Sequence, residues 1–447
     1  MENMDSTVIT TSLPAIAADI GENPLALKLA LTSYLVSLAV FIPISGWVAD
    51  RYGSRTVFSV AIIVFVGGSL LCAASTSLPA FIAARFVQGI GGAMMVPVGR
   101  LVLLRAVPKQ EYVTALNYLT IPALMGPVIG PALGGAITVY FHWRWIFLIN
   151  VPIGLLGVYL VQRHIPNLVE QTIPPFDWRG FALSGIGLSV LMLGLSALGG
   201  HLMPAPVTAA TVVGGAVVLV AYAAHARRTP HPSLDLRMLR IPTFFNGVAA
   251  GSLFRIGVGA TPFLLPLLLQ LGFGLNPLQS GLITCATAVG AMFMKTLTVA
   301  ILRRWGFRDV LSFNALMAAA SVAVCAFFTA STPHLVIIAV LLVSGCLRSL
   351  QFTALQALSF ADTTRENMSQ ATSIASMAQR LAQSLGIAVG AYALELSSLA
   401  QHHASIVAED FPPAFIAVAA IQRSACSFID GYRVRREPKC RDTCLSK

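Results

Sequence analysis

The sequence Gly126-Pro-Val-Ile-Gly130-Pro-Ala-Leu-Gly134-Gly135 lies inside an apolar run from about 113 to 140. Its glycines recur every four residues, so on a helix they share one face and leave a groove for another backbone. Pro127 and Pro131 lie on the same ridge, and each frees a carbonyl that only neighbouring helices can satisfy within lipid. The stretch predicts a helix packed inside a membrane bundle. A tightly packed helix with no further role is the alternative, because small-xxx-small spacing is common in bundles.

The whole chain has the composition of an integral membrane protein. Of its 447 residues, 56% are hydrophobic and only 11% are charged, with a net charge of +11, which is too apolar for a water-soluble domain. The basic residues lie in short connections and form no face interleaved with aromatic residues, so we expect no nucleic-acid partner. No residue spacing predicts a metal site, a disulfide framework or a membrane-embedded enzyme. His402 and His403 are expected to be solvated in an outer loop.

Twelve apolar segments have the length of a spanning helix, about 20 residues, namely 26–49, 56–76, 78–104, 113–140, 143–162, 180–200, 206–226, 243–271, 278–302, 309–330, 334–360 and 369–398. Shorter segments flank them at 5–20 and 411–421. The predicted fold class is an all-α integral membrane protein with two six-helix bundles plus two inserted central helices, the first and last helices being incomplete. The predicted parts are an N-terminal bundle, the inserted helices with flanking cytoplasmic loops, a C-terminal bundle and a basic tail, at 1–163, 164–240, 241–421 and 422–447.

Positive charge alternates along the connections between these segments. The connections 50–56, 100–112, 163–179, 227–240, 303–309 and 361–367 hold 15 Lys and Arg residues, whereas the opposite connections hold only Lys28 and Arg144. Because basic loops stay in the cytoplasm, the first set is predicted to be cytoplasmic and both ends of a complete chain would be inside. A turn at Gly306, flanked by arginines, echoes the turn at Gly53.

The turn Gly46-Trp-Val-Ala-Asp50-Arg51-Tyr-Gly53-Ser-Arg55 lies on the predicted cytoplasmic side. Gly46 would allow close helix approach, and Gly53 would permit a backbone conformation that other residues resist. Asp50 could lie near a helix N-terminus or an arginine, so the cluster could latch two bundle halves together. The alternative is a solvated tight turn.

Two charged residues fall within predicted membrane helices of the first half. Arg85, in Arg85-Phe-Val-Gln88-Gly89, lies about seven residues into its helix, where an unpaired charge costs several kcal/mol. It should face a polar interior, or else extend to the outer interface. Asp5, in Met4-Asp5-Ser-Thr7, is a candidate proton site because burial and a nearby arginine act on its protonation in opposite directions. The alternative is that Asp5 only caps the first helix.

The second half carries several cations within its apolar helices. Arg255, Arg348 and Arg380 lie near helix centres, Lys295 lies nearer a cytoplasmic end, and Glu395 is the one acid inside these helices. If several face a cavity, that cavity is electropositive and suits an anionic or zwitterionic substrate. The alternative is that the arginines bind carbonyl groups and the side chains of Gln351, Gln379 or Gln383.

These motifs, in this order and spacing, resemble the major facilitator superfamily, most closely the 14-helix drug:proton antiporters of the EmrB/QacA type. The similar stretches are Asp5 to Pro14, Gly46 to Arg55, Arg85 to Gly89, Gly126 to Gly135 and Arg144 to Gly154. The resemblance covers Asp5 to about Ala420 and implies export of drugs or other small amphiphilic compounds by alternating access, driven by the proton gradient without a cofactor. It further implies a multi-pass protein of a bacterial cytoplasmic membrane, in contact with lipid, working as a monomer and with envelope proteins as possible partners.

The resemblance also implies roles for individual residues. Asp5 and Thr7 would bind proton or substrate with Arg85 and Gln88, while Gly46, Asp50, Arg51, Gly53 and Arg55 would gate the cytoplasmic side. Gly126, Pro127, Gly130, Pro131, Gly134 and Gly135 would favour antiport by sealing leaks. A proton-linked symporter or facilitator for a small metabolite is the alternative within transport.

The two ends depart from the family pattern. Only Met1 to Met4 precede Asp5, which predicts that the acid lies at the chain end instead of mid-membrane, and the last helix stops near Ile421 before a tail holding three of the seven cysteines. A late start or truncation at the front and a frameshift at the back would explain both. A truncated, non-functional transporter is therefore a further alternative.

Overall fold

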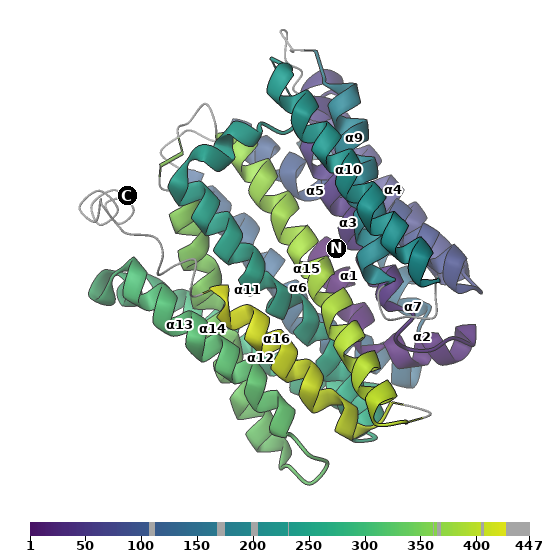
Figure 1. Ribbon diagram of the computed structural model, residues 1–447. Helices are drawn as coiled ribbons and strands as arrows, with labels where there is room; N and C mark the ends of the chain where they lie inside the picture. Colours follow the sequence, from purple (N-terminus) through teal and green to yellow (C-terminus); the bar gives the residue numbers. More distant parts are fainter. Residues whose placement is uncertain are drawn as a thin grey trace. The chain divides into compact units, whose positions relative to one another are not determined.

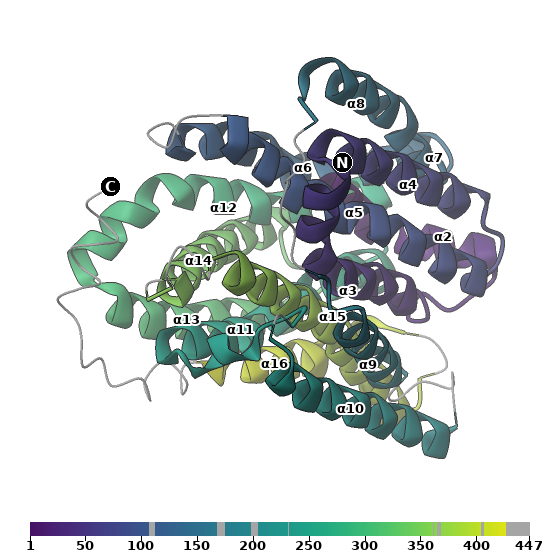
Figure 2. The same ribbon diagram turned by 90° about the horizontal axis from the view of Figure 1, so that it is seen from above.

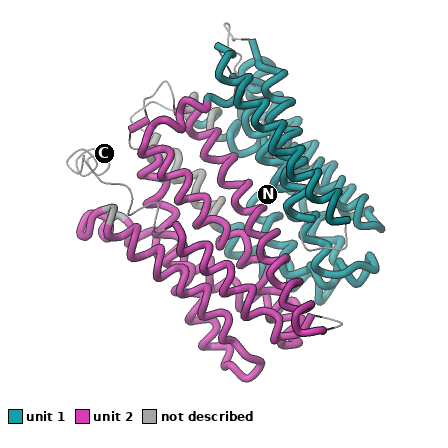
Figure 3. Tube along the Cα trace, viewed as in Figure 1, with its two compact units in different colours: residues 1–235 teal, residues 236–447 magenta. Residues whose placement is uncertain are grey.

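The computed structural model describes residues 1–106, 112–167, 175–197, 204–230, 232–360, 362–363, 368–403 and 406–425. Every regular element in these ranges is a helix (Figure 1). The chain forms two compact units, Met1–Asp235 and Leu236–Lys447 (Figure 3). Within the described residues, ten helices are long and apolar enough to cross a membrane. These helices lie where the hydropathy pattern places them, which confirms the predicted all-α membrane fold.

Unit 1 contains the helices of the first half and the inserted pair. They are α1 (Glu2–Val8), η1 (Ile9–Thr11), α2 (Leu13–Ile20), α3 (Lys28–Tyr52), α4 (Ser54–Ala74), α5 (Leu78–Ala106), α6 (Tyr112–Tyr140), α7 (Trp145–Leu148), α8 (Asn150–His164), α9 (Trp178–Ser196) and α10 (Ala205–Arg228). The segment predicted as one helix from 5 to 20 is thus α1, η1 and α2. Proline cannot donate a backbone hydrogen bond, and Pro14 lies in the first turn of α2, where none is needed.

The groove predicted on α6 is occupied by α1. A Cβ on Gly134 would overlap the carbonyl oxygen of Val8, and one on Gly130 would overlap the hydroxyl of Thr7. Thr11 Oγ1 donates to the carbonyl of Pro131 at 3.3 Å. Hydroxyl groups of α1 and η1 therefore lie near backbone carbonyls of α6, the helix that contains Pro127 and Pro131. Such contacts are expected where lipid offers no hydrogen-bond partner.

The helices α9 and α10 pack against each other and lie side by side in both ribbon views (Figure 2). Asp177 caps α9 by accepting from the backbone N–H of Gly180 at 2.8 Å, and its carboxylate also lies 2.8 Å from Nε2 of His225 on α10. Trp178 of α9 packs edge-on against Trp47 of α3, with ring centroids 5.7 Å apart. The inserted pair is thus tied to α3 within unit 1.

Unit 2 contains the helices of the second half. They are η3 (Leu236–Arg240), α11 (Pro242–Leu267), η4 (Leu268–Gly272), α12 (Pro277–Trp305), α13 (Phe307–Val324), η5 (Cys325–Phe327), α14 (His334–Phe360), α15 (Met368–Ala400), η6 (Ala408–Asp410) and α16 (Phe411–Arg423). α11 contacts both α14 and α15. Gly386 of α15 lies against the Ile256 backbone so closely that a Cβ would overlap its carbonyl oxygen, so a small residue is what lets these two helices cross.

The turns at Gly53 and Gly306 have similar backbone conformations. Gly53 separates α3 from α4 with φ +87°, and Gly306 separates α12 from α13 with φ +77°. Positive φ is strained for residues with a side chain, which confirms the expectation for Gly53. The expectation for Gly46 is wrong for this conformation, because a Cβ there would meet nothing within 4 Å.

The C-terminal end of α15 differs from expectation at a second position. His402 is exposed, but His403 is not simply solvated, since its Nδ1 lies 2.8 Å from Oδ1 of the fully buried Asp410. The carboxylate of Asp410 also accepts from the backbone N–H of Val407 at 3.0 Å. A buried carboxylate needs such partners, and a residue seven positions further along the chain could not be foreseen from the His-His pair.

Candidate functional site

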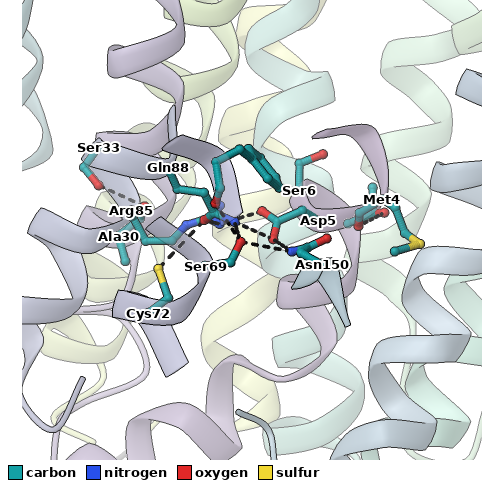
Figure 4. Close-up of polar contacts among 12 residues, drawn as sticks. Met4, Asp5, Ser6, Ala30, Ser33, Ser69, Cys72, Arg85, Gln88 and Asn150 are labelled. Atoms are coloured by element: carbon teal, nitrogen blue, oxygen red, sulfur yellow. Dashed lines mark hydrogen bonds and ion pairs between the residues drawn. The ribbon is translucent and has the colours of Figure 1, made fainter. Parts of the chain in front are cut away.

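Asp5 and Arg85 form a buried ion pair inside unit 1 (Figure 4). Arg85 Nη1 lies 2.6 Å from Asp5 Oδ2, and the two side chains are 1% and 2% exposed. Asp5 comes from α1 and Arg85 from α5, so the contact joins residues 80 positions apart. Asp5 is buried within unit 1 although only four residues precede it, and the expectation that it lies at the chain end instead of mid-membrane stays a prediction. The alternative in which Arg85 extends to the outer interface is wrong, because its side chain is 1% exposed.

Further donors surround the Asp5 carboxylate. Oδ1 accepts from Gln88 Nε2 at 2.9 Å and from Asn150 Nδ2 at 3.1 Å. Both amides also donate to Ser69 Oγ, at 2.8 and 3.2 Å. Within the described residues, the carboxylate of Asp5 therefore accepts from three donors, on Arg85, Gln88 and Asn150. The site gathers side chains from α1, α4, α5 and α8.

The guanidinium of Arg85 lies over two aromatic rings. Its Cζ lies 4.3 Å from the ring centroid of Tyr34 and 5.9 Å from that of Phe147. Nη1 also donates to Gln88 Oε1 at 2.5 Å, whereas Nε is buried with no hydrogen-bond partner in the described residues. Loss of the Asp5 charge would leave this cation with ring faces and an amide oxygen alone, and a buried charge without its counter-ion is costly.

The structure separates Thr7 from Asp5. The hydroxyl of Thr7 donates to the carbonyl of Met4 at 2.9 Å and lies 3.4 Å from the carbonyl of Gly126. Thr7 thus belongs to the contact between α1 and α6. Of the residues predicted to bind proton or substrate in the first half, Asp5, Arg85 and Gln88 come together and Thr7 does not join them.

The predicted gating residues lie at the turn between α3 and α4. Asp50 is half-buried, Arg51 is exposed and Arg55 is half-buried. A Cβ on Gly53 would overlap the side chain of Asn167, which follows α8. The turn is therefore packed rather than freely solvated, and its gating role stays a prediction.

Arg144 closes a second polar cluster near the end of α2. Its Nη1 lies 2.6 Å from Asp19 Oδ2, and its Nη2 donates to the carbonyl of Ser75 at 3.2 Å. Trp143 Nε1 donates to the same Asp19 oxygen at 3.1 Å. The hydrogen bond from Arg144 is the largest influence on Asp19 and holds the pKa of that carboxyl below its ordinary value.

The predicted cations of the second half have unlike surroundings. Arg255 is 6% exposed, and its guanidinium carbon lies 4.9 Å from the ring centroid of Phe352. Arg348 and Arg380 are half-buried, and Lys295 donates to Thr353 at 2.8 Å. Gln351 does not bind an arginine; its side chain bonds Asn314 and the carbonyl of Leu311. That part of the alternative is wrong.

Sequence reasoning missed three residues of the buried site: Ser69, Tyr34 and Asn150. The signal for Asn150 was present, because an amide within an apolar segment needs a partner, but its distance from Asp5 along the chain gave no pairing. An apolar pocket was also missed. It is lined by Leu29, Ser33, Leu78, Pro79, Ile82, Ala83, Phe86 and Val87 of α3 and α5.

Comparison with known proteins identifies the family. The family described as Major Facilitator Superfamily matches residues 1–387. Proteins named multidrug resistance protein MdtD from Serratia proteamaculans and Escherichia coli are each 38% identical, over 90% and 91% of this chain and 84% and 86% of their own length. The crystal structure of a D-xylose-proton symporter has a similar fold, with a TM-score of 0.69 at 14% identity over 98% of this chain and 96% of that one. The chain belongs to the Major Facilitator Superfamily of membrane transporters.

Proposed function

We propose that this chain exports drugs or other small amphiphilic compounds in exchange for protons, by alternating access. The observation that carries the proposal is the buried pair of Asp5 and Arg85, a titratable acid and a fixed cation inside the helix bundle. The names of the relatives from Serratia proteamaculans and Escherichia coli support drugs as cargo. Each proton that moves inward gains about 2.3 kcal/mol per 100 mV of membrane potential, which can drive cargo outward.

Proton binding to Asp5 is the proposed switch. Once protonated, the carboxyl no longer neutralises Arg85, and it cannot accept from Arg85, Gln88 and Asn150 as the charged group does. The helix α1 would then lose its strongest tie to α5 and could move. Cargo binding that favours the charged form of Asp5 would expel the proton, so that proton and cargo exclude each other.

The packing of α1 on α6 gives the predicted glycine motif a physical role. Because Gly126, Gly130 and Gly134 bring α6 against the backbone of the first segment, any movement of Asp5 is transmitted to α6. The tight contact would also leave no water path along α1, which suits exchange without leak. We assign the gating of the cytoplasmic side to the turn from Gly46 to Arg55.

The proposal includes the setting in which the protein works. It would lie in the cytoplasmic membrane of a bacterium, with the arginine-rich connections inside, and need no cofactor besides the proton gradient. We propose a monomer as the transporting unit, with envelope proteins as further partners.

The direction of flux tests antiport against symport. Purified protein in liposomes receives an imposed pH gradient, and the movement of fluorescent dyes of both charge signs is followed. Antiport predicts that dye moves toward the side with the higher proton concentration, whereas symport predicts that dye moves away from it. Movement that ignores the gradient would contradict proton coupling.

A further inference from the structure

Unit 2 contains a buried arginine that has no acid partner among the described residues. Arg255 on α11 is 6% exposed, its Nε has no hydrogen-bond partner in the described residues, and its guanidinium lies against the ring of Phe352. Arginine stays charged under all physiological conditions, and a ring face compensates only a small part of a buried charge. In unit 1, by contrast, the buried Arg85 is neutralised by Asp5, with Nη1 2.6 Å from Oδ2.

A second cation shares the helix face of Phe352. Arg348 precedes Phe352 by four residues on α14, so the two side chains lie on one face. Arg348 is half-buried and has no hydrogen bond or ion pair to any residue that the structure describes. Phe352 therefore contacts the guanidinium of Arg255 and shares a face of α14 with Arg348, and neither arginine has a carboxylate partner in the described part of the chain.

The residues that flank Phe352 on α14 do not supply the missing negative charge. Thr353, the next residue on α14, accepts from Lys295 of α12 at 2.8 Å, so its partner is a further cation. The buried amide of Gln351 is engaged by Asn314, on another side of α14. Groups buried without partners require a ligand, an ion or a cost in stability.

We propose that Arg255 and Arg348 bind the carboxylate of a small aromatic or amphiphilic cargo, whose apolar part lies against Phe352. Guanidinium groups bind carboxylates through paired, charge-assisted hydrogen bonds, and an aromatic ring offers a stacking surface beside them. The inference rests on the proposed function, because it names the class of cargo that the exporter would take. It predicts a preference for anionic and zwitterionic compounds over lipophilic cations.

Three naphthalene compounds test the preference by charge alone: 1-naphthoate, 1-naphthamide and 1-naphthylmethylammonium. Purified full-length protein in phosphatidylcholine nanodiscs is titrated with each compound, and binding is followed by thermal unfolding. The expected result is that only naphthoate raises Tm. A wild-type protein that shows no naphthoate response, or an equal response to the ammonium compound, would overturn the proposal.

Substitutions locate the site. Arg255→Gln and Arg348→Gln should each weaken naphthoate binding about tenfold or more, since each removes a charge-assisted contact. Arg255→Lys should bind at intermediate affinity, and Arg304→Gln, which changes an exposed arginine at the end of α12, should bind as the wild type does. Unchanged affinity in Arg255→Gln would refute the assignment.

Gly251 offers a test that does not depend on removing the arginine. A Cβ at Gly251 would lie 2.6 Å from Arg255 Nη1, the flexible tip of the side chain, so Gly251→Asp would supply a carboxylate one helical turn from Arg255. Gly251→Asp should abolish naphthoate binding while it raises Tm, and the matched Gly251→Asn should keep binding. Equal binding by both variants would count against the site.

Lipid composition and transport distinguish a cargo site from a lipid-binding site. If added phosphatidylglycerol abolishes the naphthoate response, the arginines belong to lipid headgroups and the proposal for cargo fails. Because binding needs no pH gradient, it is independent of proton coupling. If naphthoate binds but no gradient-driven transport is seen, the proposed antiport is contradicted and the cargo site is not. If Arg255→Gln leaves antiport of every anionic dye unchanged, the cargo site is contradicted and the proposed antiport is not.

Discussion

Alanine substitutions at three glycines should have graded effects on stability that follow what each new methyl group would meet. A Cβ at Gly134 would overlap the carbonyl oxygen of Val8, one at Gly130 would overlap the side-chain hydroxyl of Thr7, and one at Gly46 would meet nothing within 4 Å. A backbone carbonyl within a packed helix pair cannot move aside, whereas a hydroxyl can rotate. The expected order of stability is therefore Gly46→Ala, then Gly130→Ala, then Gly134→Ala.

The magnitudes follow from two opposing effects. Overpacking costs roughly 1–3 kcal/mol, while replacing a helical glycine by alanine gains up to about 1 kcal/mol. Gly46→Ala should thus be neutral or slightly stabilising, and Gly134→Ala should destabilise by about 1–2 kcal/mol. Gly130→Ala should lie between them, because rotation of Thr7 sacrifices hydrogen bonds worth about 1 kcal/mol.

Reversible unfolding by SDS in mixed micelles, followed by tryptophan fluorescence, measures these differences. Thr7→Ala removes the obstructing hydroxyl, so it should rescue Gly130→Ala but not Gly134→Ala, and a double-mutant cycle reports the coupling. Equal unfolding midpoints for Gly46→Ala and Gly134→Ala would refute the packing of α1 in the α6 groove.

Three further predictions concern separate parts of unit 1. Asp19→Asn should lower stability by about 0.5 kcal/mol near neutral pH, since the pair with Arg144 is partly exposed; because the folded pKa of Asp19 is lowered, the difference from wild type should vanish as the pH falls below about 4 in thermal scans. Gly53→Ala should destabilise by about 1–2 kcal/mol because of its positive φ, and Asn167→Ala should not rescue it fully, which unfolding titrations would reveal. Asn150→Ala removes a donor to Asp5 and should slow gradient-driven transport about tenfold, a result that unchanged initial rates in liposomes would contradict.

The sequence predicted those features that depend on residue spacing along one helix or on residue type at one position. The four-residue glycine spacing predicted a close approach on α6, and the turn sequence predicted a backbone conformation at Gly53 that other residues resist; both were confirmed. The conformation of Gly53 could be predicted because backbone conformation is a local property. The burial of Arg85 could also be predicted, since an arginine seven residues into an apolar helix requires a partner. The identity of that partner as Asp5 was a suggestion of the family resemblance, and the contact at 2.6 Å bears out the pairing.

The remaining features depend on which helices meet, and a single sequence does not specify that. Gly46 was expected at a close contact, yet open space surrounds it. Asn150 and Ser69 complete the Asp5 site from helices 145 and 64 positions further along the chain. Similarly, counting from the chain start does not show that Asp5 is buried, because its burial depends on the contacts that α1 makes with Arg85 of α5 and with α6.

The proposed proton site can be tested most directly by measuring the protons that cargo binding releases. Weakly buffered, detergent-solubilised protein is mixed with a transported dye, and a pH indicator reports proton release. The wild type should release protons on dye binding at a pH where Asp5 is partly protonated, whereas Asp5→Asn should bind dye and release none. Asp5→Asn should also retain dye exchange across liposomes without a gradient while it loses uphill transport. Proton release by Asp5→Asn equal to that of the wild type would contradict the assignment of Asp5 as the proton carrier.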